Sequence, residues 1–213
     1  MSAVALKPGR LSHAEAATVP IGALTAWQGL LDRTKIQAGE RLLVHGAAGA
    51  VGCFVVQLAH RRGAHVIVTA SPANAEFVKG LGADDVIDYR AERFEEAAPE
   101  VDVVFDTVGG ETLRRSWSVL KPGGRIVTIA AGEESTTEER VKQAFLLVEA
   151  RRDQLMAIGR LLESGEIRAV VDAVVPLSQA SDAFACKVPR QHRGKVVVTM
   201  DKADPSSSVT AAQ

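Results

Sequence analysis

Short apolar runs and longer amphipathic segments alternate along much of the chain. The apolar runs predict strands buried on both faces, and the segments between them carry apolar residues at helical spacing. This alternation is typical of a parallel sheet with helices on both faces. We therefore predict an α/β fold with a doubly wound parallel sheet. The predicted strands are 41–46, 65–70, 85–89, 101–106 and 125–130, with a further apolar run at 144–149, and the predicted helices are about 50–62, 72–81 and 110–120.

A glycine-rich turn follows the first predicted strand. Gly46, Gly49 and Gly52 have the spacing of a dinucleotide-binding turn, in which they permit a tight turn, close approach of a pyrophosphate and close helix packing. The pyrophosphate would lie at the positive end of the helix that begins near Ala50. An ordinary strand-to-helix turn is the alternative, but the apolar strand before it and the helix after it favour a Rossmann nucleotide site. The candidate residues here are Gly46, Ala47, Ala48, Gly49, Ala50, Val51 and Gly52.

Less regular segments flank this core. Residues 12–33 predict a helical segment, 153–163 a further helix, and 168–175 and 195–199 predict strands with a helix at 178–187 between them. We expect an N-terminal helical arm over 1–36, a Rossmann domain over 37–165, a C-terminal βαβ-like segment over 166–200 and a disordered tail over 201–213.

Composition narrows the partners and the compartment. The net charge is -1 with 24% charged residues, so no basic surface indicates nucleic acid or an anionic membrane. Cys53 and Cys186 are the two cysteines, and without further ligands nearby we expect buried thiols and no metal site. The sequence shows neither a signal peptide nor a membrane-spanning run, so we expect a cytoplasmic protein.

The end of the second strand bears on cofactor choice. An NAD site usually has an acidic residue there for the ribose hydroxyls, whereas this chain has a threonine, an alanine and Ser71. Ser71 and Asn74 could donate hydrogen bonds to a 2′-phosphate, which favours NADP(H) over NAD(H). The alternative for Ser71 is that it caps the helix that starts at Pro72.

Several motifs in order closely resemble zinc-independent medium-chain dehydrogenases/reductases of the quinone oxidoreductase (zeta-crystallin-like) group. They are GALTAW at 22–27, AGERLLVHGAAGAVG at 38–52, LGADDVIDY at 81–89, VFDTVGG at 104–110, LKPGGRIV at 120–127 and RGKVVV at 193–198. In that family a GroES-like catalytic domain precedes the point where this chain begins. The resemblance implies the cofactor-binding half of such an enzyme and the segment that packs back on the catalytic half.

The resemblance also implies site residues and an activity. Tyr89 would reach the 2′-phosphate, the alternative being that it only packs. Thr25 would lie near the nicotinamide, or else bond to its own helix backbone. Residues after the fourth and fifth strands would flank the nicotinamide and its ribose: Thr107, Val108, Gly109 and Ala130.

The expected reaction is NADPH-dependent hydride transfer to a quinone or an α,β-unsaturated carbonyl (enone), without an obligate metal or protein nucleophile, so no catalytic residue is assigned. A non-catalytic NADPH-binding module and a truncated gene product are the alternatives. The resemblance further implies a homodimer that pairs through the apolar run at 144–149, which we expect to form an edge strand.

Overall fold

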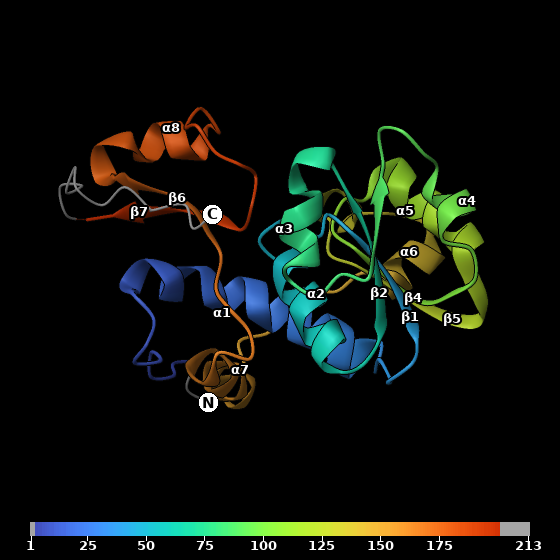
Figure 1. The fold of residues 1–213 in the computed structure, drawn as a ribbon, viewed down its shortest axis with the longest axis horizontal. Helices are drawn as coiled ribbons and strands as arrows, with labels where there is room; N and C mark the ends of the chain where they lie inside the picture. The colour runs from blue at the N-terminus through green and yellow to red at the C-terminus, as the bar shows by residue number, and fades with distance from the viewer. Residues whose placement is uncertain (1–2, 201–213) are drawn as a thin grey trace.

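The computed structural model describes residues 3–200 and contains a five-stranded parallel sheet with the strand order β3-β2-β1-β4-β5. The first strand lies at the centre of the sheet, and the chain winds outward from it in both directions (Figure 1). This confirms the predicted doubly wound Rossmann fold. The strands are β1 (Arg41–His45), β2 (His65–Ala70), β3 (Asp85–Asp88), β4 (Val101–Asp106) and β5 (Leu120–Thr128).

Both faces of the sheet are buried, which explains the nearly continuous apolar strands. Alternate residues of β1 enter different cores: Leu42 packs with the helices of one face, and Leu43 packs with Phe94 and Val119 on the other. Figure 1 shows α2 and α3 on one side of the sheet and α4 and α5 on the other. The helices and turns of these two layers are α2 (Gly52–Arg61), η2 (Pro72–Asn74), α3 (Ala75–Lys79), α4 (Phe94–Ala97), α5 (Gly110–Ser116) and η3 (Trp117–Val119).

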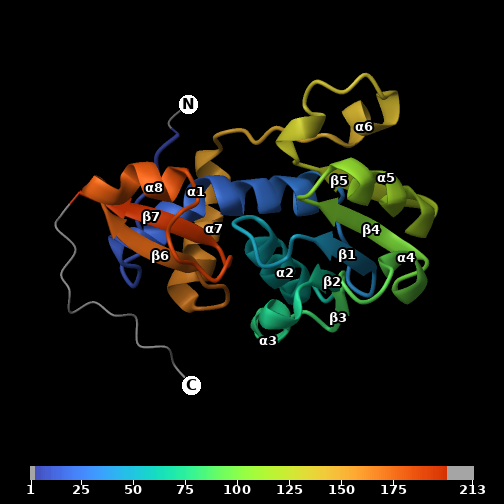
Figure 2. The same cartoon turned by 90° about the horizontal axis from the view of Figure 1, so that it is seen from above.

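The N-terminal helical arm is α1 (His13–Trp27), which continues into a π-helix, η1 (Gln28–Arg33). Ser12 and Glu15 form a capping box that begins α1. The helix packs on α2, on α7 (Arg152–Ser164) and on the strands of the C-terminal segment. Figure 2 shows α1 running between the large sheet and the C-terminal segment. The arm therefore joins the two parts of the molecule.

The C-terminal segment is a second, two-stranded parallel sheet, which confirms the βαβ-like prediction. It consists of β6 (Val171–Pro176), η5 (Leu177–Gln179), α8 (Ala180–Phe184) and β7 (Lys195–Thr199). Cys53 is buried as expected, but the prediction for Cys186 is wrong, because α8 ends before this residue and leaves its side chain exposed. The predicted tail, 201–213, lies outside the described residues.

The run 144–149 is not the strand that its apolar pattern predicts. After η4 (Ala131–Glu133), helix α6 (Glu139–Ala144) ends within this run, and Phe145 forms only an isolated bridge to Thr128 of β5. The Gln28 side chain explains the departure: it donates to the Glu149 carbonyl at 2.8 Å and accepts from the Glu149 N–H at 2.9 Å. These bonds hold the end of the run against η1.

Candidate functional site

The turn between β1 and α2 requires glycine at two of its three predicted positions. Gly46 has φ +75°, and a Cβ there would lie 2.1 Å from Thr107 Oγ1. A Cβ on Gly52 would lie 2.2 Å from the Gly46 carbonyl oxygen. The Gly49 N–H closes the turn by donating to the same carbonyl at 3.0 Å. The helix begins at Gly52, two residues later than predicted, because residues 46–51 are used for this turn.

Gly49 differs from the other two glycines. Within 4 Å, a Cβ on Gly49 would meet only the Gly46 carbonyl oxygen, at 3.2 Å, so this position is far less crowded than the other two. At the start of α2 the N–H groups of Cys53 and Phe54 donate to the carbonyls of Gly49 and Val51, at 3.1 and 2.9 Å, so the turn itself satisfies them. The positive end of the helix dipole lies just beyond this turn. An uncrowded backbone beside a helix N-terminus fits an anion such as a pyrophosphate.

A cavity of about 510 Å³ opens beside the turn, at the carboxyl ends of the inner strands. It brings together three predicted site residues: Gly46, Tyr89 and Val108. The side chains of Tyr89 and Val108 have large exposed surfaces, each residue being 55% exposed, so Tyr89 is not a core packing residue. The other lining residues are His45, Thr69, Glu92, Phe94, Thr112 and Arg115.

His45 forms part of the floor of this cavity and is almost fully buried. Its Nδ1 lies 3.0 Å from Thr69 Oγ1, and its Nε2 lies 3.0 Å from Ser116 Oγ. Ser116 donates its own hydrogen to the Thr112 carbonyl at 2.6 Å, so it accepts from His45 Nε2–H, and Thr69 donates to Nδ1. Burial first, then the charge of Arg115, lowers the pKa of His45 from 6.5 to about 4. The ring is therefore a neutral structural group.

The loop after β4 is held by two buried carboxylates that the sequence analysis missed. Asp106 accepts from the N–H groups of Val108 at 3.1 Å and Gly109 at 3.0 Å, and from Thr128 Oγ1 at 2.7 Å. Glu133 accepts from the next N–H, that of Gly110, at 2.8 Å. Burial raises the pKa of Asp106 despite these bonds. The sequence did hold a signal for Asp106, because it ends a strand just before Thr-Val-Gly-Gly. A glycine-rich loop of this kind has several backbone N–H groups that need an acceptor, and a carboxylate beside it can supply one.

The loop after β2 contains the predicted phosphate donors, and an unpredicted arginine joins them. Ser71 makes no capping bond, so its expected role as a helix cap is wrong: the chain enters a short 3₁₀ turn there, and Asn74 N–H bonds the Ser71 carbonyl instead. Arg193 Nε donates to Asn74 Oδ1 at 2.8 Å, and its Nη2 donates to the Ala73 carbonyl at 2.8 Å. The Arg193 guanidinium also lies over the ring of Phe77, at 4.9 Å from its centroid.

The residue after Arg193 contacts the glycine turn. Gly194 N–H donates to the Ala48 carbonyl at 2.8 Å, and Gly194 forms an isolated parallel bridge with Gly49. The C-terminal segment therefore reaches both the predicted pyrophosphate turn and the predicted 2′-phosphate loop. Sequence reasoning could not find this contact, because Arg193 and Asn74 are 119 residues apart.

Two other predicted residues lie deeper in the fold. Thr25 is 4% exposed, and its hydroxyl donates to the Ile21 carbonyl at 2.7 Å, which is the helix-backbone alternative. Its role near a nicotinamide stays a prediction. Ala130 is buried beside the loop after β4, where a Cβ on Gly109 would lie 2.6 Å from the Ala130 Cβ.

Comparison with known proteins identifies the family. Residues 81–198, more than half of the chain, match the family described as zinc-binding dehydrogenase. The chain belongs to this family. It holds the NAD(P)-binding part of these medium-chain dehydrogenases/reductases, as the resemblance implied.

Several members of the dehydrogenase family are similar over most of this chain. The 2-methylene-furan-3-one reductase of Solanum lycopersicum is 38% identical, covering 92% of this chain and 49% of that protein. The NADPH-dependent alkenal/one oxidoreductase of Arabidopsis thaliana, a chloroplastic protein, has the same identity and coverage. The quinone oxidoreductase of Coxiella burnetii superposes with a TM-score of 0.81 at 32% identity, covering 92% of this chain and 64% of that one. The chain thus spans about half to two thirds of these relatives.

The described residues of this dehydrogenase domain do not fit a zinc site. Between residues 3 and 200, no three His, Cys, Asp or Glu side chains lie close enough together to hold a metal ion. Burial raises the pKa of Cys53 to about 12, so its thiol stays protonated and is a poor metal ligand. In the same range, no helix is both long and apolar enough to span a bilayer.

Proposed function

We propose that this chain binds NADPH and serves an oxidoreductase that transfers hydride to a quinone or an α,β-unsaturated carbonyl compound. The observation that carries the cofactor choice is the arginine beside the loop after β2. Arg193 hydrogen-bonds to Asn74, and Ser71 lies in the same loop with a hydroxyl that does not cap the helix. The first acidic residue after β2 is Glu76, whose exposed carboxylate pairs with Lys79 at 3.1 Å.

This loop has the charge that a 2′-phosphate requires. A carboxylate after β2 would accept from the ribose hydroxyls of NADH and repel the 2′-phosphate of NADPH. Here the only charged group hydrogen-bonded to residues 71–74 among the described residues is the cation of Arg193. Asn74 accepts from Arg193 through Oδ1, so the side-chain NH₂ group of Asn74 does not take part in this bond and is the proposed donor to the phosphate. Tyr89, half-exposed after β3, is the further proposed contact to this phosphate.

The other proposed contacts follow the carboxyl edge of the sheet. The pyrophosphate would lie over Gly49 before the start of α2, where a Cβ would meet only the Gly46 carbonyl oxygen within 4 Å. Thr107, Val108 and Gly109 after β4, together with Ala130 after β5, would flank the nicotinamide ribose and ring. When bound, the reduced nicotinamide supplies the hydride, and the protein orients it. The names of the tomato and Arabidopsis relatives, an enone-type reductase and an alkenal/one oxidoreductase, support this substrate class.

The test compares NADPH and NADH affinity in three proteins. We expect Arg193→Leu to raise the Kd for NADPH at least about tenfold and to change that for NADH less than about twofold, because it removes a charge-assisted contact to the phosphate. Arg190→Leu, an exposed position in the same segment, is the matched control and should change neither. Ser71→Asp should shift preference toward NADH. Equal losses for both cofactors in Arg193→Leu would overturn the assignment of NADPH.

We further propose that the chain forms a homodimer through the run 144–149. The run is not a regular strand, but Phe145 continues the sheet beside β5 through its bridge to Thr128. Leu147, two residues later in the run, is 69% exposed, and an exposed apolar side chain close to a sheet edge in sequence favours association.

A further inference from the structure

Three side chains form a stack that ends at the cavity beside the glycine turn. The His45 ring packs edge-on against Phe94, with centroids 4.6 Å apart and an interplanar angle of 66°. The Arg115 guanidinium lies over the same Phe94 ring, with its Cζ 4.9 Å from the ring centroid. His45, Phe94 and Arg115 all line the same cavity. Because His45 is neutral, the stack holds one positive charge, that of Arg115.

The Arg115 guanidinium is fixed in its plane by one carboxylate. Its Nε and Nη2 each donate to a different oxygen of Glu95, at 2.6 Å in both cases. The hydrogen bond from Arg115 lowers the pKa of Glu95 to about 2, so the pair stays ionised at neutral pH. One edge of the guanidinium is held by Glu95, and the Phe94 ring lies on one side of it. Because the Arg115 side chain is still 42% exposed, we take the side opposite Phe94 as the face on which a ligand can lie, and call it the free face.

The cavity that Arg115 lines reaches the part of the sheet where the adenosine half of a dinucleotide would bind. The cavity is lined from the ends of β1 and β2, from Tyr89 after β3, and from Val108 and Thr112 after β4. Its Thr69 and Tyr89 end lies on the side of the sheet that carries Ser71 and Asn74. A dinucleotide bound across the sheet places its adenosine half on the side of β2. Ala130, by contrast, follows β5 at the opposite edge.

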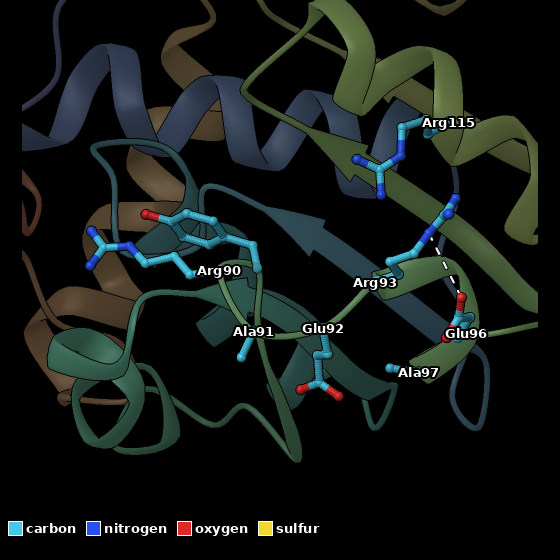
Figure 3. A pocket seen from close by; sticks show the side chains of 8 residues that line it. Arg90, Ala91, Glu92, Arg93, Glu96, Ala97 and Arg115 are labelled. Atoms are coloured by element: carbon cyan, nitrogen blue, oxygen red, sulfur yellow. Dashed lines mark ion pairs between the residues drawn. The ribbon is translucent and has the colours of Figure 1, made fainter.

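A neighbouring pocket shares Tyr89, Glu92 and Arg115 with this cavity. Figure 3 shows Arg115, Arg93 and Glu96 on one side of the pocket and Arg90 on the other side. Arg93 is already paired with Glu95 and Glu96, and Arg90 lies over the Tyr89 ring at 5.7 Å. Of these three arginines, Arg115 alone lines both the cavity and the neighbouring pocket, and its guanidinium lies over a buried aromatic ring.

We infer that Arg115 is an adenine-binding residue: its free face stacks on the purine ring of the cofactor, and Phe94 and Glu95 hold it flat for that contact. Planar guanidinium groups stack on aromatic rings, whereas an ammonium group offers only a point charge. This inference rests on the proposed NADPH site. It adds a side chain that recognises the adenine base and contacts neither the pyrophosphate nor the 2′-phosphate.

The test measures binding of 2′,5′-ADP, the adenosine half of the cofactor, by calorimetry and by the change in purine ultraviolet absorbance. Arg115→Ala and Arg115→Lys should both raise the Kd about five- to tenfold and reduce the hypochromic change, because each removes the planar face. Arg114→Ala is the matched control on the same helix: Arg114 pairs with Glu138 and lines neither hollow. It should bind like the wild type.

Glu95→Gln separates stacking from a phosphate contact. If Arg115 stacks, freeing its guanidinium from Glu95 should weaken binding about two- to fivefold even at high salt. Tighter binding by Glu95→Gln, or wild-type affinity in Arg115→Lys, would show that Arg115 acts through its charge and would overturn the inference. Wild-type affinity in Arg115→Ala would overturn it as well, while leaving the proposed NADPH site intact. Failure of the wild-type chain to bind both 2′,5′-ADP and NADPH would overturn the proposed function together with this inference.

Discussion

The buried, neutral His45 predicts a specific dependence of stability on pH. Its pKa falls from 6.5 to about 4 on folding, so the unfolded chain takes up a proton below pH 6.5 that the folded chain does not. The stabilising contribution is complete above the unfolded pKa and is lost as pH falls toward the folded pKa. One pKa unit corresponds to ~1.36 kcal/mol, so between pH 7 and pH 5 we expect a loss of roughly 2 kcal/mol from this residue alone.

The assay is urea unfolding at pH 7, 6 and 5 of the wild type and of His45→Gln. Glutamine offers one acceptor and one donor for Thr69 and Ser116 but does not titrate. Subtracting the two profiles cancels the contribution of the carboxylates, and the wild type should lose roughly 2 kcal/mol more than the variant. Parallel profiles would refute the argument, because they would show that His45 is protonated equally in the folded and unfolded chains.

Two further predictions concern stability and one concerns assembly. Gly52→Ala should lower the free energy of unfolding by at least about 2 kcal/mol, because its Cβ would lie 2.2 Å from a backbone oxygen. Gly132→Ala is the control, since its Cβ would meet nothing within 4 Å, and similar melting temperatures of the two variants would contradict the prediction. Asp106→Ala should cost about 2–3 kcal/mol in chemical unfolding, since two loop N–H groups lose their acceptor. Light scattering should give a dimer mass that Leu147→Lys reduces, and a wild-type monomer at micromolar concentration would exclude the proposed dimer.

The sheet and its glycine turn could be predicted because their signals are local. Apolar runs that are buried on both faces identify the strands, and the turn needs glycine for reasons confined to neighbouring residues, as the close approach of Gly52 to the Gly46 carbonyl shows. The NAD(P)-binding fold follows from such short-range patterns. The positions of Gly46, Tyr89 and Val108 around one cavity also follow, since each comes just after a strand of the same parallel sheet, and the carboxyl ends of parallel strands meet at one edge.

Two of the errors arose where distant segments decide the local structure, whereas the error at Ser71 is local. An apolar run such as 144–149 has the pattern of an edge strand, but hydrogen bonds from Gln28, 121 residues away, hold its end against η1. Arg193 was missed for the same reason, because its partner Asn74 is remote in sequence. Ser71 has the sequence pattern of a helix cap, yet the backbone after it forms a 3₁₀ turn whose N–H group bonds the Ser71 carbonyl.

Binding of NADPH to the glycine turn is the central claim, and Gly49→Val tests it most directly. A Cβ at this position would meet only the Gly46 carbonyl oxygen within 4 Å, at 3.2 Å, so we expect the variant to fold with a small shift of the turn and to occupy the space of the pyrophosphate. We would follow the melting temperature of the wild type and of Gly49→Val during titration with NADPH. NADPH should raise the wild-type melting temperature with concentration and leave that of the folded variant unchanged. An equal NADPH-dependent rise in both proteins would contradict the account.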